Sequence, residues 1–546
     1  MRSALMTVST EMASRWLSGW TVSRICSRRE SFCGSVMVRK RTSVCSASAP
    51  GEAWPELGWN RSVTGGKRKT ARRCRVVREE TMKEFDIAVV GAGPGGYVAA
   101  IKAARAGAAT CVIEDDKAGG TCLNRGCIPT KALFSTAHLL RRLRQAADHG
   151  IDIPSLNFDY TRAAERKDKV VAKLVGGVEQ LLKGHGVDLF RGRGTLEGPG
   201  RLRVRRGGVV GHVRAKKIIL ATGSLPAVPK SLPVDEENIL TSTGILAIKN
   251  LPQSLLVVGG GYIGCEFASI FSTFGCRVTV VEALPRLLAM SDRQAVREVE
   301  KSFQKQDVKV LTGTSVTSLE TIDGGVRATL SNGDVLQVEK VLIAIGRRPN
   351  TEGLGLEEVG VARDERGCVR VDDQMRTSVD DVYAIGDVTG GIQLAHVASY
   401  QAGIAVTNAL GGAAHADYRV VPSSIFTLPE VSQVGLSEEQ CKEQGIEVAI
   451  GRFAYLATSK AVCEGETEGS IKLLAEKRSG RLLGASIAGA DASTLIAEVG
   501  VAMAAGLTAE QLGEIIHSHP TLPEMVKEAA EDVSGQAVHK VGRRKR

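Results

Sequence analysis

The chain has 546 residues, of which 43% are hydrophobic, and a formal net charge of +11, so it is too long for one hydrophobic core and several domains are expected. The basic surplus lies at the N-terminus, because residues 1–81 hold 16 Lys or Arg against 6 Glu, whereas residues 82–546 hold 55 basic against 54 acidic residues. This balance argues against a nucleic-acid-binding surface on the main body, and the absence of any run of 18 or more apolar residues argues against a membrane span.

Residues 1–81 differ in composition from the rest, since they contain all four tryptophans and four of the twelve cysteines but no aspartate. Met82 lies three residues before the first expected strand, so one interpretation is that translation begins there and residues 1–81 are never made. The Arg- and Ser-rich composition is also typical of an organelle transit peptide, and a basic arm that binds a partner is a third interpretation. The protein is expected in the cytoplasm under the first interpretation and in an organelle matrix under the second.

The first expected strand, FDIAVV from residue 85, is followed by the glycine pattern GAGPGG and an alanine-rich helix. Gly91 makes the turn, Gly93 lets a pyrophosphate approach the backbone, and Gly96 lets helix and strand pack closely, so the pattern predicts a dinucleotide site. A second strand ends at Glu114, 23 residues after Gly91, where a carboxylate can accept from ribose hydroxyls.

The segment GGTCLNRGCIPTK, residues 119–131, places Cys122 and Cys127 five positions apart. On one straight helix their Cα atoms would be roughly 8 to 9 Å apart, beyond the ~7 Å limit for a disulfide, so the chain must bend between them. Gly126 permits the bend, and the apolar stripe that follows predicts a helix beginning near Cys127, whose positive end would acidify a thiol. A redox pair is one interpretation, and two buried core cysteines are the alternative. The other body cysteines are scattered, which favours a reducing compartment.

The glycine pattern recurs at Gly259, Gly261 and Gly264, and the next strand ends at Glu282, again 23 residues after the first glycine. A second dinucleotide site is therefore predicted, and a carboxylate at Glu282 favours NAD over NADP because it would repel a ribose 2′-phosphate. A vestigial fold element is the alternative interpretation. A later strand ends in AIGD, where Asp387 could bind a polyol or simply cap a helix.

Near the C-terminus the phrase HSHPTLPE contains His519 and Glu524. A neutral imidazole held by a carboxylate is suited to remove a proton from a thiol, although most His–Glu pairs are surface ion pairs.

The phrases GAGPGG, GGTCLNRGCIPTK, ATGS, GGGYIGCE, GRRPN, AIGD, LAH and HSHPTLPE occur in an order that resembles the flavin-dependent pyridine nucleotide-disulfide reductases, and among them the dihydrolipoyl dehydrogenase branch. The resemblance covers residue 82 to about residue 535. It implies an α/β fold with two Rossmann-like domains, one for FAD and one for NAD, and a C-terminal α+β dimerisation domain. The implied division is a leader (1–81), a first FAD-binding part (82–225), an NAD-binding domain (226–350), a central domain completing the FAD site (351–420), a dimerisation domain (421–539) and a basic tail (540–546).

The resemblance also implies roles for individual residues. The implied catalytic set is the Cys122–Cys127 redox disulfide, the base His519 with Glu524 and the supporting His517, and Lys131 with its acidic partner Glu266. The implied FAD contacts are Gly91, Gly93, Gly96, Glu114, Gly120, Thr121, Lys131, Gly194, Thr222, Gly223, Ser224, Asp387, Gln393, Leu394, Ala395 and His396. The implied NAD contacts are Gly259, Gly261, Gly264, Glu282, Val316 and Gly346.

By resemblance, then, the chain is expected to oxidise protein-bound dihydrolipoamide and reduce NAD, as a homodimer whose base reaches the disulfide of the other subunit. The expected partners are lipoyl domains of 2-oxo acid dehydrogenase or glycine cleavage complexes, and no metal is expected. Glu282 disfavours a glutathione reductase, and the chain end KVGRRKR lacks the cysteines of a mercuric reductase. A non-catalytic flavin- and NAD-binding scaffold is the alternative from another class. The charged Arg125 between the cysteines departs from the small apolar residue of many relatives.

Overall fold

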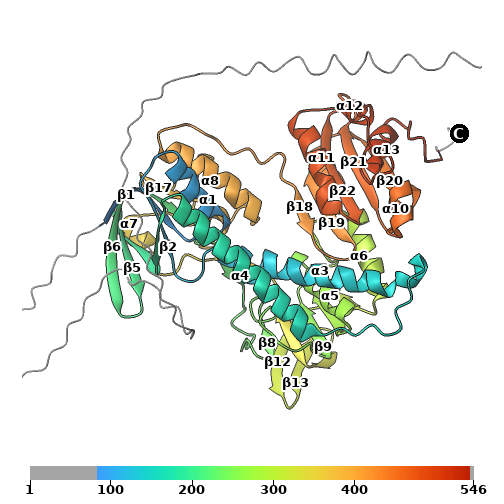
Figure 1. Ribbon diagram of the computed structural model, residues 1–546, viewed down its shortest axis with the longest axis horizontal. Helices are drawn as coiled ribbons and strands as arrows, with labels where there is room; N and C mark the ends of the chain where they lie inside the picture. Colours follow the sequence, from blue (N-terminus) through green and yellow to red (C-terminus); the bar gives the residue numbers. More distant parts are fainter. Residues whose placement is uncertain (1–82, 542–546) are drawn as a thin grey trace, which may run out of the picture. The chain divides into compact units, whose positions relative to one another are not determined.

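The computed structural model describes residues 83–541 (Figure 1). The predicted leader, residues 1–81, lies outside the described residues, as does most of the predicted basic tail.

The first sheet has a parallel core with an antiparallel extension. In the order β3-β2-β1-β6-β5-β4, with β17 pairing β6, its strands are β1 (Lys83–Val90), β2 (Thr110–Glu114), β3 (Asp188–Arg191), β4 (Arg193–Gly198), β5 (Arg201–Arg206), β6 (Val209–Leu220) and β17 (Val382–Ala384). Strand β1 begins two residues earlier than the sequence predicts, because Lys83 and Glu84 pair with Val213 and Arg214 of the long strand β6. The chain contributes β17 from more than 160 residues beyond β6, so the segment after residue 350 returns to the first sheet.

Helices pack against this sheet and against one another. Helix α1 (Pro94–Arg105) lies beside α8 (Ala395–Ala409), and α3 (Cys127–Arg144) runs beside α4 (Tyr160–Gly184) (Figure 1). The remaining short helices of this part are α2 (Gly120–Arg125), η1 (Ala146–His149), α7 (Leu356–Val359) and η2 (Gly386–Thr389). Alanines on α1 make the close packing possible, since Ala99, Ala100 and Ala103 are fully buried.

The second sheet repeats the plan of the first. Its parallel strands, in the order β11-β10-β9-β15-β8, are β8 (Ile239–Leu240), β9 (Ser254–Val258), β10 (Arg277–Glu282), β11 (Lys309–Thr312) and β15 (Lys340–Ile343). An antiparallel meander again accompanies it, built from β12 (Val316–Ile322), β13 (Gly325–Leu330) and β14 (Val335–Val338). Its helices are α5 (Tyr262–Phe274) and α6 (Arg293–Lys305). Strands β7 (Ser224–Pro226) and β16 (Arg347–Pro349) pair where the chain passes between the two sheets.

The C-terminal part is an antiparallel sheet packed against helices. Its strands, in the order β18-β19-β22-β21-β20, are β18 (Ser423–Ile425), β19 (Glu430–Gly435), β20 (Val448–Ala454), β21 (Ser470–Glu476) and β22 (Leu482–Gly489). Its helices are α9 (Glu438–Glu443), η3 (Tyr455–Ala457), α10 (Ser459–Glu464), α11 (Ala492–Ala504), α12 (Ala509–Gly513) and α13 (Glu524–Asp532). The predicted fold class, two Rossmann-like units and a C-terminal α+β unit, is confirmed.

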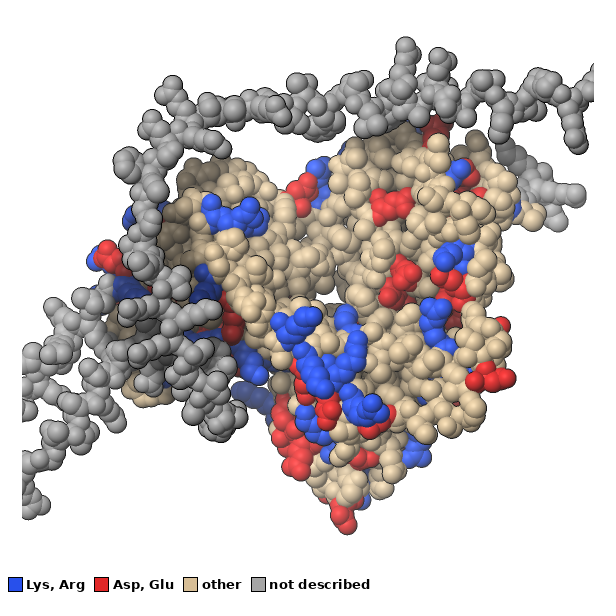
Figure 2. Space-filling model, in the orientation of Figure 1, with Lys and Arg blue, Asp and Glu red and all other residues tan. Residues whose placement is uncertain are grey.

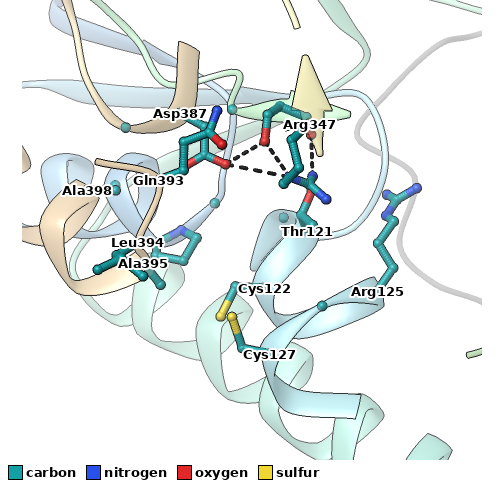
Figure 3. A pocket seen from close by; sticks show the side chains of 18 of the residues that line it. Thr121, Cys122, Arg125, Cys127, Arg347, Asp387, Gln393, Leu394, Ala395 and Ala398 are labelled. Carbon is teal, nitrogen blue, oxygen red and sulfur yellow. Dashed lines mark hydrogen bonds and ion pairs between the residues drawn. The ribbon is translucent and has the colours of Figure 1, made fainter. Parts of the chain in front are cut away.

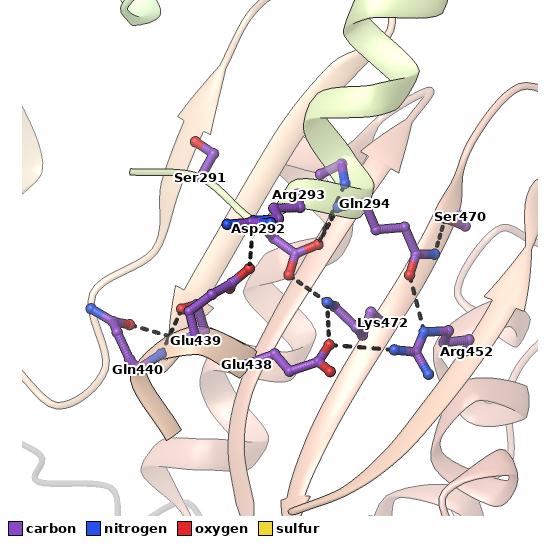
Figure 4. Close-up of polar contacts among 12 residues, drawn as sticks. Ser291, Asp292, Arg293, Gln294, Glu438, Glu439, Gln440, Arg452, Ser470 and Lys472 are labelled. Carbon is purple, nitrogen blue, oxygen red and sulfur yellow. Dashed lines mark hydrogen bonds and ion pairs between the residues drawn. The ribbon is translucent and has the colours of Figure 1, made fainter. Parts of the chain in front are cut away.

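A buried ion pair ties the second unit to the C-terminal sheet. Asp292 caps α6 by accepting from the backbone N–H of Gln294 and Ala295, and its carboxylate also meets the Lys472 ammonium of β21 at 2.5 Å (Figure 4). Both side chains are almost fully buried, at 3% and 6% exposure. The partly exposed Glu438 completes the network at 2.9 Å from Lys472.

Surface charge on the visible face is mixed, with Lys and Arg beside Asp and Glu (Figure 2), as the near-neutral composition of the body predicts. Between residues 83 and 541, no helix is both long and apolar enough to cross a membrane.

Candidate active site

The two glycine loops have matching geometry. Gly91 has φ +101°, and a Cβ there would lie 2.4 Å from the carbonyl oxygen of Ala221, while a Cβ on Gly96 would lie 1.8 Å from the Gly91 carbonyl oxygen. At the second loop Gly259 has φ +109°, and a Cβ on Gly264 would lie 1.9 Å from the Gly259 carbonyl oxygen. The first glycine therefore serves the turn and the third serves the contact between helix and strand, in both loops.

The middle glycines leave space in front of a helix N-terminus. A Cβ on Gly261 would meet no atom within 4 Å, and one on Gly93 would meet only the Cα of Gly120, at 4.0 Å. The backbone N–H groups at the starts of α1 and α5 can therefore approach a phosphate closely.

The two acidic residues at the strand ends also correspond. Glu114 accepts from the backbone N–H of Ala92 at 2.7 Å and of Asp116 at 2.9 Å. Glu282 accepts from the equivalent groups of Gly260 at 2.6 Å and Leu284 at 2.7 Å. Burial raises the pKa of Glu114, and the two N–H donors oppose that shift.

A cavity of about 1160 Å³ passes from the first glycine loop to the two cysteines. The predicted residues that line it are Gly91, Gly93, Glu114, Gly120, Thr121, Cys122, Cys127, Lys131, Gly194, Thr222, Gly223, Ser224, Glu266, Asp387, Gln393, Leu394, Ala395 and His396. The cavity extends from a dinucleotide loop to a dithiol, and its volume is above the upper end of ordinary ligand pockets. Both features fit a bound FAD. Gly96 lies behind the loop and does not line the cavity.

The two cysteines face each other across a bend in the chain (Figure 3). Cys122 lies on α2, Gly126 breaks the helix with φ −148° and ψ −117°, and α3 begins at Cys127, so the predicted bend and helix start are confirmed. A hydrogen bond from the Cys122 thiol lowers the pKa of Cys127 to about 7, with help from the Lys131 charge and against the effect of burial. The same hydrogen bond and burial raise the pKa of Cys122. Cys127 is thus the more acidic thiol of the pair.

Lys131 lies one helical turn beyond Cys127 and pairs with a residue distant in sequence. Its ammonium group is 2.9 Å from both carboxylate oxygens of Glu266 on α5 and 4.4 Å from the centre of the Phe426 ring. Glu266 is buried and also accepts from the backbone N–H of Phe426 at 2.9 Å. Elements of all three units therefore fix this cation beside the dithiol.

Arg347 is a site residue that the sequence prediction did not include. Its guanidinium donates to the Ser224 hydroxyl at 2.7 Å and to the Ser224 carbonyl at 2.8 Å, and Ser224 in turn bonds Asp387 (Figure 3). The phrase GRRPN contains Arg347, although the sequence prediction includes only its glycine, Gly346. Arg347 fixes the orientation of Asp387 at the cavity wall.

The predicted base does not line this cavity in the single chain. His519 Nδ1 lies 2.8 Å from Glu524, whose other oxygen accepts from the Thr521 N–H, and the imidazole is 69% exposed. These bonds lower the pKa of Glu524 against a burial effect that raises it. His517 pairs separately with Glu498 at 2.6 Å.

The predicted contacts of the second dinucleotide also lie outside the cavity. Gly346 has φ +135° between β15 and β16, and the half-buried Val316 begins β12. Thr314, two residues before Val316, donates its N–H to the Glu282 carbonyl at 3.0 Å, so Val316 follows the end of β10 closely. Within the described range, no group of three or more His, Cys, Asp or Glu could hold a metal ion.

Two family models match the chain. Residues 85–402 match the pyridine nucleotide-disulphide oxidoreductase model, and residues 421–530 match the dimerisation domain of the same family.

Curated relatives and solved structures agree with these models. The chain is 44% identical over 448 residues to a dihydrolipoyl dehydrogenase of Chlamydia muridarum, covering 82% of this chain and 96% of the relative. It is 40% identical over 459 residues to that of Geobacillus stearothermophilus, covering 84% and 97%. Among solved structures it is similar to LpdA of Mycobacterium tuberculosis (29% identity, TM-score 0.78, covering 83% and 100%). It is also similar to the HOCl-induced flavoprotein disulfide reductase RclA of Escherichia coli in its Cu(II) complex (32% identity, TM-score 0.76, covering 82% and 99%).

Proposed function

The chain belongs to the pyridine nucleotide-disulphide oxidoreductase family, and from that premise we propose that it oxidises dihydrolipoamide to lipoamide and reduces NAD to NADH. The observation on which the proposal mainly rests is the pair of facing cysteines beside the Lys131–Glu266 ion pair at one end of the long cavity. A scaffold protein would need neither an acidified thiol nor a fixed cation beside it.

The two cysteines have different tasks. Cys122 is the exchanging sulfur: a substrate thiolate attacks it, the Cys122–Cys127 bond breaks, and Cys127 leaves as the thiolate. The second substrate thiol, as its thiolate, then attacks the substrate sulfur of the mixed disulfide, which forms the lipoamide disulfide and releases Cys122 as the thiolate. Two electrons have passed from substrate to the enzyme dithiol. The lowered pKa of Cys127 makes it the better leaving group, and the Lys131 charge stabilises it.

The cavity would hold FAD, which would supply the redox chemistry that links the dithiol to NAD. The residues proposed to hold it are the cavity-lining set given above, with α1 directing its N-terminus at the pyrophosphate. NAD is proposed to bind at the second glycine loop, with Glu282 on its ribose and Val316 and Gly346 as further contacts. Residues 82–225 with 351–420 thus form the FAD unit, residues 226–350 the NAD unit and residues 421–539 the interface unit.

His519 is proposed as the base, acting on the dithiol of the other subunit of a homodimer. Its exposure and its place outside the cavity of its own chain favour this arrangement, and the match of residues 421–530 to a dimerisation domain supports it. Glu524 holds Nδ1 and so leaves Nε2 to take the proton of the attacking thiol.

The substrate in the cell is proposed to be a lipoyl domain of a 2-oxo acid dehydrogenase or glycine cleavage complex. The names of the curated relatives support the dihydrolipoyl group. The compartment is the cytoplasm if translation begins at Met82 and an organelle matrix if residues 1–81 are a transit peptide. The intact mass of the native protein decides between them.

The test of the dithiol is a spectrum of the holoenzyme during stoichiometric reduction with NADH. A long-wavelength band between thiolate and flavin should appear in the wild type and be lost in Cys127→Ser, and a Cys463→Ser variant, on the exposed α10 cysteine, should keep it. Steady-state rates with NADH against NADPH, and with lipoamide against glutathione disulfide, test the substrates. Equal turnover of glutathione disulfide would overturn the assignment.

A further inference from the structure

Three consecutive carboxylates line the cavity next to the first glycine loop. Glu114 ends β2, Asp115 and Asp116 follow it, and all three belong to the cavity wall. The corresponding residues after Glu282 at the second loop are Ala283 and Leu284, which have no charge. The first site therefore carries two more acids than its counterpart. The same cavity must accept a doubly negative pyrophosphate, and these carboxylates would repel it.

Arg125 neutralises one of these acids. Its guanidinium forms an ion pair with Asp116, and its side chain extends from α2 away from the two sulfurs (Figure 3). Asp116 in turn donates its backbone N–H to Glu114 at 2.9 Å. Arg125 is thus connected through Asp116 to the acid at the end of β2 and, through the chain of α2, to Cys122.

The other cations of the cavity have other partners. Lys131 pairs with Glu266, Arg347 donates to Ser224, and Arg193 lies 3.8 Å from Asp115. Arg191, which does not line the cavity, forms its ion pair with Glu179 and contacts Asp116 by donating to its backbone carbonyl at 2.9 Å. Among residues 83–541, the ion pair of the Asp116 carboxylate is formed by Arg125.

We propose that Arg125 is a positioning residue that raises the affinity of the cavity for the anionic dinucleotide FAD by neutralising Asp116 and fixing the loop between β2 and α2. It acts through Asp116 and makes no demand on the thiol chemistry. The inference rests on the proposal that the cavity holds FAD, but not on the identity of the dithiol substrate.

The test is a double-mutant cycle on FAD affinity, measured with the full chain stripped of flavin and titrated with FAD by fluorescence quenching. Arg125→Gln should raise Kd about three- to ten-fold, the effect of one uncompensated, half-exposed charge near the ligand. Asp116→Asn alone should leave Kd unchanged or lower it, and the double variant should return Kd to within about two-fold of wild type. The Arg125→Gln effect should shrink as salt is added.

Arg419→Gln is the matched control, because Arg419 also pairs with an aspartate, Asp417, but does not line the cavity; its Kd should equal that of wild type. An unchanged Kd in Arg125→Gln would overturn the inference, and so would a double variant as weak as Arg125→Gln. Either result leaves dihydrolipoamide oxidation by the wild type intact. If instead the wild type fails to oxidise dihydrolipoamide while the FAD Kd values of the variants follow the predicted pattern, only the proposed substrate is contradicted.

Discussion

The hydrogen bond between the two thiols should control the charge state of Cys127. Its pKa is lowered to about 7 from an ordinary value of 9.0, first by the Cys122 hydrogen bond and then by Lys131, against burial. About half of Cys127 is therefore thiolate at pH 7, whereas a cysteine of ordinary pKa would be about 1% thiolate. Because the pKa is depressed, the thiolate persists as pH falls from 9 and is lost as pH passes below about 7.

Cys122→Ala removes the donor and should raise the pKa of Cys127 by at least about one unit, which cuts the thiolate fraction at pH 7 to about a tenth or less. Cys122→Ser keeps a hydroxyl donor and should show a smaller rise. The assay is the rate of iodoacetamide alkylation of Cys127 in the reduced holoenzyme from pH 5 to 10, followed by mass spectrometry of its peptide. Alkylation of the exposed Cys463 in the same samples provides the internal standard.

The reasoning would fail if the alkylation midpoint of Cys127 in Cys122→Ala stayed within about 0.3 units of wild type. Lys131 would then account for the lowered pKa. A Lys131→Met variant measured in the same way separates the two causes, because it leaves the thiol donor in place.

Lys472→Met leaves the Asp292 carboxylate buried without its ion-pair partner and should lower the free energy of unfolding in urea by about 3 to 5 kcal/mol. The control Lys305→Met breaks an exposed pair and should lower that free energy by under about 1 kcal/mol. Equal decreases in the two variants would contradict the burial argument. Gly264→Ala forces a Cβ to 1.9 Å from the Gly259 carbonyl oxygen, so NADH affinity should fall at least ten-fold while flavin content stays normal. Unchanged NADH binding would show that the second loop is not part of the NAD site. Glu524→Gln weakens the orientation of the proposed base, and kcat for dihydrolipoamide should fall at least about ten-fold with FAD content unchanged; full activity would exclude this carboxylate from catalysis.

The glycine spacing, the acids 23 residues beyond each loop and the bend at Gly126 could all be read from the sequence. Each depends on local backbone geometry, such as a positive φ, a close approach of backbone atoms or a helix start, and the residues that decide it are neighbours in the chain. The same locality explains why β1 begins two residues before the predicted strand, since the pairing of Lys83 with Val213 depends on a strand 130 residues away. The domain boundaries remain a prediction.

The sequence by itself therefore determined the two nucleotide loops, the dithiol and the fold class, because these depend on short patterns. The family resemblance already implied the Lys131–Glu266 pair, whose members are 135 residues apart in sequence, but the tertiary structure alone decided the other polar contacts of the site. The Arg347–Ser224 contact joins residues 123 apart, and the Arg125–Asp116 ion pair depends on the path of the loop between β2 and α2. Ion pairs depend on distances of a few ångströms, and such distances between residues far apart in the chain are set by the packing of whole elements.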